Sequence, residues 1–145
     1  MIPMSPNSDV IERRLAHQRE LLSEIRKLHP LTADRLSAEP LVRAAVERIM
    51  QAVVDLALDI NGHIAISVLN RSPATGRESF DLMVAAGVLE ASHAENLKPA
   101  VGLRNILVHM YTDIDTELIA GSSNEFAEVF SEYVRSVARW VLSRG

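Results

Sequence analysis

Apolar residues recur every three or four positions over long stretches of this chain, the spacing that places them on one face of an α-helix. Between Asp9 and Leu28 the repeat is clear, and the His29-Pro30 pair should end the helix. A longer repeat runs from Leu41 to about Leu69, with no proline and one glycine. The pattern therefore predicts a first amphipathic helix and a long central helix.

The central segment carries more apolar residues than one helix face needs. Outside its main stripe lie Val53, Val54, Ala57, Leu58, Ala65, Ile66 and Val68. We expect a second helix surface, which a second copy of the chain can supply, to cover these side chains.

Three further helices are predicted from capping signals and apolar spacing. Thr75 and Glu78 have the spacing of a capping box, and Gly87 suits the left-handed end of a short helix. Ser92 to Glu95 should open a helix toward His109, which Pro99 should kink or divide. Ser122 to Glu125 should cap a last helix whose apolar face contains Phe126, Phe130, Tyr133, Val137 and Val141.

These segments together indicate the fold class and the domain organisation. No strand-like alternation and no internal repeat is persuasive, so we expect an all-α, up-and-down bundle of four to five helices. We expect residues 1–8 to form a disordered N-terminal segment and residues 9–145 to form a single domain, which suits a chain of 145 residues.

Composition narrows the possible chemistry. The chain has no cysteine, which excludes disulfides, thiolate metal sites and cysteine nucleophiles. It shows no secretory signal and no charge-free apolar run of membrane-spanning length, so we expect a cytoplasmic protein without a membrane segment. The net charge of -4 gives no overall basic footprint, and any RNA binding must depend on a local field.

Asp55, Asp59 and His63 repeat at four-residue spacing on the central helix. They can present two carboxylates and an imidazole to a metal or to a neighbouring cation. We favour a polar helix stripe over a metal site, and we expect no metal and no cofactor.

The second candidate lies between Val101 and Tyr111. On a regular helix Asn105 and His109 share a face, while Arg104 and His109 point about 140° apart. Convergence of Arg104 and His109 on one phosphate needs either a helix that ends near His109 or a twofold axis that adds a second chain.

The string Gly-Leu-Arg-Asn-x-Leu-Val-His-x-Tyr at residues 102–111 resembles the motif of the HEPN superfamily. Within it, the chain resembles in particular the HepT-type toxins that are paired with a minimal nucleotidyltransferase (MNT) antitoxin. It extends from about Leu41 to Tyr133 and is specific only in this string.

The resemblance implies a HEPN-like bundle that forms a homodimer and cleaves RNA without a metal, in a cleft between subunits. Arg104 and His109 would be catalytic, and Asn105 would orient His109 or the phosphate. Tyr111 would be the tyrosine that receives AMP from the antitoxin. The chemistry fits, because RNA carries its own nucleophile, the 2′-OH, and needs only proton transfer and charge stabilisation. The alternative is a HEPN-like dimeric module without catalysis that binds a nucleotidyltransferase or a nucleotide.

Overall fold

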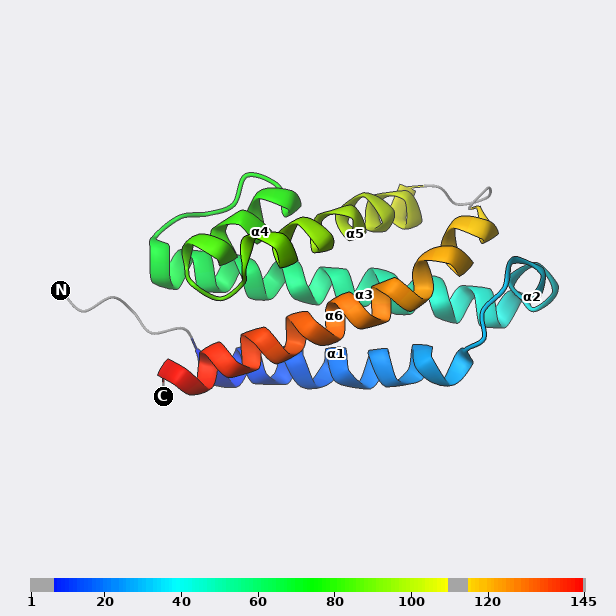
Figure 1. Cartoon of the computed structure of the whole chain (residues 1–145), viewed down its shortest axis with the longest axis horizontal. Coiled ribbons are helices and arrows are strands. Elements are labelled where there is room, and N and C mark those ends of the chain that lie inside the picture. The colour runs from blue at the N-terminus through cyan, green and yellow to red at the C-terminus, as the bar shows by residue number, and fades with distance from the viewer. Residues whose placement is uncertain (1–6, 110–114, 145) are drawn as a thin grey trace.

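The computed structural model describes residues 7–109 and 115–144. They form an all-helical bundle, as predicted, with its long helices side by side (Figure 1). In chain order the elements are α1 (Ser8–Leu28), α2 (Ala33–Ala38), α3 (Pro40–Ile64), the π-helical segment η1 (Ala65–Leu69), α4 (Gly76–Ala85), α5 (Ala91–His109) and α6 (Thr116–Arg144). The expected four to five helices become six in the described part of the chain, because the short α2 was not predicted.

The start and the end of α1 follow from local chemistry. The Asn7 side chain accepts hydrogen bonds from the backbone N–H groups of Asp9 and Val10, which caps the helix. At the other end His29 leaves the helical conformation just before Pro30. Helix α1 therefore spans the predicted segment. Residues 1–6 lie outside the described residues, and the disordered segment 1–8 and the single domain 9–145 stay predictions.

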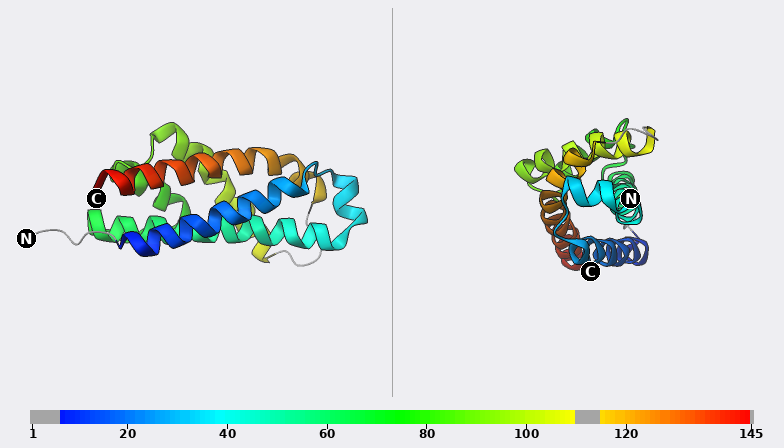
Figure 2. Two further views of the ribbon diagram at one scale, coloured as in Figure 1. Left: turned by 90° about the horizontal axis from the view of Figure 1, so that it is seen from below. Right: turned by 90° about the vertical axis from the view of Figure 1, so that its right-hand side faces the viewer.

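Helix α3 is the central element of the bundle. It lies between α1 on one side and α4 and α5 on the other, as the end-on view shows (Figure 2). Pro40 stands in its first turn, where the missing N–H costs nothing, and η1 continues the helix to Asn70, which takes a left-handed conformation. The stretch Pro40–Leu69 is long and apolar enough to span a membrane, but it packs against α1, α2, α4, α5 and α6 as the central helix of this bundle.

The surplus apolar residues of the central helix are covered mainly by the chain itself. Val53, Val54, Ala57 and Ala65 are buried, Leu58 and Val68 are half-buried, and only Ile66 is largely exposed. The second helix surface that we expected is therefore supplied for most of this helix by α1, α4 and α5 of the same chain. A homodimer would therefore have to form through surfaces other than the central helix.

A buried polar network joins α3, α4 and α6 inside the core. The Tyr133 hydroxyl lies 2.7 Å from Oδ1 of Asn61 and 3.2 Å from the Ala57 carbonyl oxygen. The Asn61 amide nitrogen donates to the Ser79 hydroxyl at 3.0 Å. Burial raises the pKa of the Tyr133 phenol well above its ordinary value. The network fixes how these three helices pack.

Two of the predicted helix starts were wrong. Helix α5 begins at Ala91, so Ser92 lies inside it, and Pro99 neither ends nor divides it. Helix α6 begins at Thr116, six residues before Ser122. The reason is that Asp115 acts as the cap, since its carboxylate accepts the N–H groups of Glu117 and Leu118. The cap at Thr75 was right, because its hydroxyl accepts the Glu78 N–H, while the Glu78 carboxylate accepts the N–H of Ala74. Gly87 follows the same helix with a left-handed φ of +80, as predicted.

Candidate active site

The Arg104 side chain is anchored to the central helix. Its Nε donates to Oδ1 of Asp55 at 2.7 Å, and the side chains are 29% and 36% exposed. This charge-assisted bond fixes the root of the guanidinium while leaving its outer edge accessible. From the sequence, Asp55 was a candidate partner for a metal or for a neighbouring cation; in the structure it binds the cation Arg104.

The other two residues of the polar stripe, Asp59 and His63, contact α1 and its capping residue. Asp59 lies 3.9 Å from Nε of Arg14, and the His63 ring accepts the Asn7 backbone N–H at 2.9 Å. In the described residues no group of three histidines or carboxylates can hold a metal ion. The ion pairs of Asp55 and Asp59 and the bond to His63 fit a polar stripe, and the lack of a metal stays a prediction.

Asn105 lies beside the outer edge of the Arg104 guanidinium. The Nη1 atom of Arg104 is 3.3 Å from Oδ1 of Asn105, a long hydrogen bond between exposed groups. No described residue accepts a hydrogen bond from Nη2 of Arg104. Asp55 holds one nitrogen of this partly exposed guanidinium, and the donors that remain on its terminal nitrogens can bind two oxygens of a phosphate.

His109 is the last residue of α5, and its side chain is exposed. Helix α5 is unbroken up to this residue, and on a regular helix Arg104 and His109 point about 140° apart. The structure brings Arg104 and Asn105 together, but no described hydrogen bond joins His109 to either residue. Tyr111 lies outside the described residues.

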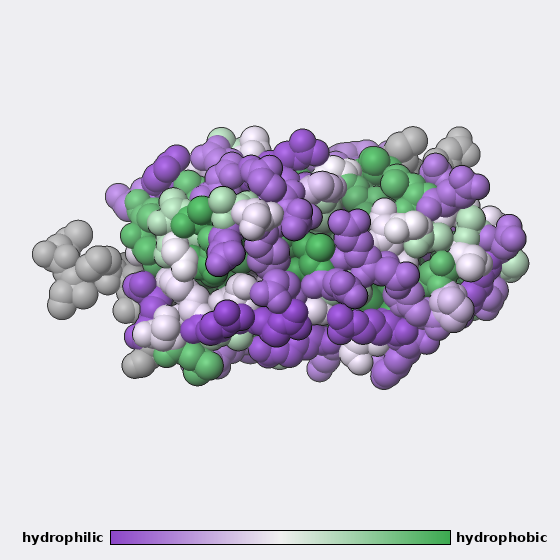
Figure 3. Space-filling view, in the orientation of Figure 1, coloured by the Kyte–Doolittle hydropathy of each residue, from purple (hydrophilic) through white to green (hydrophobic). Residues whose placement is uncertain are grey.

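Apolar surface remains uncovered next to these residues. Leu103, Ile106, Leu107 and Val108 on the last turns of α5 are only half-buried, and Leu118 at the start of α6 is 41% exposed. A groove of about 480 Å³ runs between α5 and α6 beside them. Apolar side chains gather in this region on the face shown in Figure 3. Sequence periodicity could not find this surface, because α5 has no clear apolar face.

One further cation near the site was missed by sequence reasoning. Arg77, at the start of α4, extends over Gly102 of α5, so that a side-chain carbon at Gly102 would lie 3.0 Å from Nη2 of Arg77. The one sequence signal is the glycine inside a helix, a position where the chain has room for a neighbour.

A comparison with protein families decides the identity of this arrangement. The family model described as Ribonuclease HepT-like matches residues 18–137. The chain belongs to the HepT-like ribonuclease family. The matched region includes all of α5, and therefore Arg104, Asn105 and His109.

Individual relatives agree with this membership. The chain is 27% identical over 134 residues to a protein named tRNA nuclease HepT from Aphanizomenon flos-aquae, covering 92% of this chain and 91% of that relative. It is 28% identical over 89 residues to the mRNA nuclease HepT of Shewanella oneidensis, covering 61% of this chain and 64% of that protein.

Several solved structures share this fold. A toxin–antitoxin structure with AMP-PNP aligns with a TM-score of 0.81 at 21% identity, covering 90% of this chain and 98% of that chain. The tri-AMPylated HEPN toxin of Shewanella oneidensis in complex with MNT antitoxin aligns with a TM-score of 0.80 at 22% identity and the same coverage. The cytosolic protein YutE of Bacillus subtilis aligns with a TM-score of 0.84 at 15% identity, covering 99% and 95%.

Proposed function

We propose that this HepT-like protein is an endoribonuclease toxin that cleaves RNA by attack of the 2′-OH, without a metal ion. The observation that carries the proposal is the partly exposed Arg104 guanidinium, which Asp55 holds at Nε and whose Nη1 lies beside Asn105. It lies on the helix that ends at an exposed histidine, His109.

Each of these groups has a role in RNA cleavage. Arg104 binds two phosphate oxygens and stabilises the extra negative charge that develops when the 2′-oxygen attacks. His109 transfers a proton, for which an exposed imidazole at a helix end is suited. Asn105 orients the phosphate or the imidazole by hydrogen bonding. No group here calls for a metal or a cofactor.

We propose that two copies of the chain share the site. Within one chain Arg104 bonds to Asp55 on α3, and no described hydrogen bond joins it to His109 at the end of α5, so a second chain would supply another imidazole near each guanidinium. The half-buried apolar side chains of α5 and the exposed Leu118 provide a surface for this homodimer. In-line cleavage uses a base and an acid, and the two His109 side chains would divide these roles.

A cleavage assay in EDTA tests the proposed activity. We expect the parent protein to cleave RNA with EDTA present and Arg104→Ala and His109→Ala to be inactive. His17→Ala is the matched control, because His17 is an exposed histidine on α1. Retained cleavage by His109→Ala, or cleavage abolished by EDTA, would overturn the proposal.

Mixed dimers test the division of roles. A dimer with one His109→Ala subunit should have far less than half of the parent activity, because each cleavage would need both imidazoles. Activity close to half would instead mean that the two sites act independently.

We propose that an MNT antitoxin silences the nuclease by transferring AMP to Tyr111. Tyr111 is two residues beyond His109 in the sequence, so an attached phosphodiester would bring negative charge close to the residues that bind RNA. The tri-AMPylated toxin of Shewanella oneidensis supports such a partner. After coexpression with the antitoxin, mass spectrometry should find AMP on the peptide with Tyr111 and none in Tyr111→Phe; an unmodified but silenced protein would point to inhibition by binding.

The competing function is a cytoplasmic HEPN-like module that binds its partner without catalysis. The acidic net charge of -4 favours that function, and the arrangement of Arg104 with Asn105 favours catalysis. A protein that binds the antitoxin but leaves RNA intact in the EDTA assay would establish the module instead.

A further inference from the structure

A second groove, lined by several cations, lies between α1 and α6, two helices that contribute none of the proposed catalytic residues. Its volume is about 530 Å³, and none of its eight lining residues is a carboxylate. Four are cations and two carry hydroxyl groups, namely Arg19, Arg26, Lys27, Arg135, Ser23 and Ser131. For a chain of net charge -4 this is a strong local concentration of positive charge.

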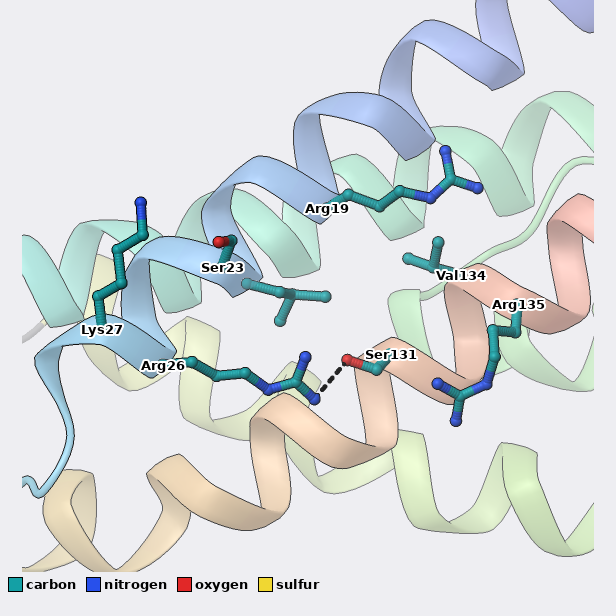
Figure 4. Close-up of a pocket in the computed structure, with 8 residues that line it drawn as sticks. Arg19, Ser23, Arg26, Lys27, Ser131, Val134 and Arg135 are labelled. Atoms are coloured by element: carbon teal, nitrogen blue, oxygen red, sulfur yellow. Dashed lines mark hydrogen bonds between the residues drawn. The ribbon is translucent and has the colours of Figure 1, made fainter.

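Both walls of the groove carry cationic and hydroxyl side chains. On α1 the residues at positions 19, 23, 26 and 27 share one helix face, with Arg19 and Arg26 two turns, or about 10 Å, apart. On α6 Ser131 and Arg135 are one turn apart. Figure 4 shows Arg26 reaching from α1 to the Ser131 hydroxyl, with Arg19 and Arg135 placed around the same hollow.

Two of the four cations are not neutralised. Lys27 pairs with Glu24 and Arg135 pairs with Glu132, each within its own helix. Arg26 donates only to the Ser131 hydroxyl, at 2.9 Å, and Arg19 has no ion pair with any described residue. Two unpaired guanidinium groups, spaced along a groove and alternating with hydroxyls, can each bind a different phosphate of one strand.

The groove also leads toward the helix of the proposed active site. Arg26, Ser131 and Arg135 line a neighbouring hollow of about 460 Å³, which reaches His93 and Asn96 on α5. Glu128 and Glu132 line that hollow as well, so the positive charge is greatest between α1 and α6.

We propose that the α1–α6 groove binds phosphates of the RNA backbone and is a second RNA-contact surface of this nuclease. The inference rests on the proposed function for the nature of the polyanion. Contacts of this kind hold a strand without reading its sequence, so the groove sets affinity and leaves cleavage chemistry to α5.

Fluorescence anisotropy with a labelled single-stranded RNA tests the groove separately from catalysis. All variants carry His109→Ala, so that the probe stays intact. Arg19→Ala/Arg26→Ala should weaken binding by about tenfold at moderate salt and lower the slope of log K against log salt by about 1.4, or about 0.7 for each lost phosphate contact. Arg19→Lys/Arg26→Lys should retain most of the slope, because the positive charges remain.

The matched control is Arg13→Ala/Arg71→Ala, which removes two exposed arginines outside the groove. It should change neither affinity nor slope, and circular dichroism should show all variants folded. Unchanged RNA binding by Arg19→Ala/Arg26→Ala would overturn the inference. Labelled polyglutamate serves as a second probe: if the double variant loses affinity for polyglutamate but not for RNA, the inference is also overturned, and the groove is assigned to an acidic protein. If the parent protein cleaves no RNA in the EDTA assay but Arg19→Ala/Arg26→Ala still weakens RNA binding, the groove is upheld as an RNA-contact surface and only the proposed nuclease activity is refuted.

Discussion

Replacing Asp55 by asparagine should reduce RNA cleavage far more than it reduces stability. The carboxylate holds Nε of Arg104 at 2.7 Å, and asparagine keeps the volume but loses the charge. Because both side chains are about a third exposed, solvent screens the pair, and its loss should lower the free energy of unfolding by less than about 1 kcal/mol. A guanidinium displaced by about 1 Å should reduce kcat by up to about 100-fold.

Kinetics on both Asp55 variants test the positioning role. In Asp55→Asn, kcat should fall more than KM rises, because Arg104 acts mainly on charge that develops in the transition state. Asp55→Glu should recover part of kcat. Asp59→Asn is the control, since Asp59 lies one turn away on the same helix face and contacts Arg14 instead. Equal losses in Asp55→Asn and Asp59→Asn, or an active Asp55→Asn, would refute the reasoning.

Stability measurements test the packing around the site. Tyr133→Phe should lower the free energy of unfolding by about 1–3 kcal/mol, because Asn61 loses a buried partner. Since burial raises the pKa of the folded phenol above the ordinary 10.0, parent stability should fall as pH rises past about 10, and Tyr133→Phe should lose less. Gly76→Ala should cost about 1–3 kcal/mol, because its new carbon would lie 3.0 Å from Val101. Gly102→Ala should be neutral or stabilising by up to about 1 kcal/mol, as it meets only a flexible arginine. Thermal unfolding of each variant checks these values.

The sequence predicted the fold well wherever a local signal decides an element. Asparagine, threonine and glycine at helix ends act on their own backbone, so α1 and α4 end near the predicted residues. Helix α6 begins earlier than predicted because Asp115, and not Ser122, acts as its cap. Helix α5 continues through Pro99, whose exposed position makes the loss of one backbone bond tolerable.

The sequence identified the candidate residues of the site, but it did not predict which residues contact one another there. The string around Arg104 is local and readable, whereas the bond from Arg104 to Asp55 joins residues 49 positions apart. Nothing in one sequence selects Asp55 over Asp59 as that partner, because both lie on the same face of the central helix. The Arg77 side chain over Gly102 and the groove between α1 and α6 depend on tertiary packing in the same way.

The chemistry of the cleaved ends tests the central claim most directly. Attack by the 2′-OH leaves a 2′,3′-cyclic phosphate on one fragment and a 5′-hydroxyl on the other. Mass spectrometry of RNA fragments made by the parent protein in EDTA should find these ends, and Arg104→Ala and His109→Ala should produce none. Fragments with a 3′-hydroxyl and a 5′-phosphate would mean that water is the nucleophile and would contradict the account.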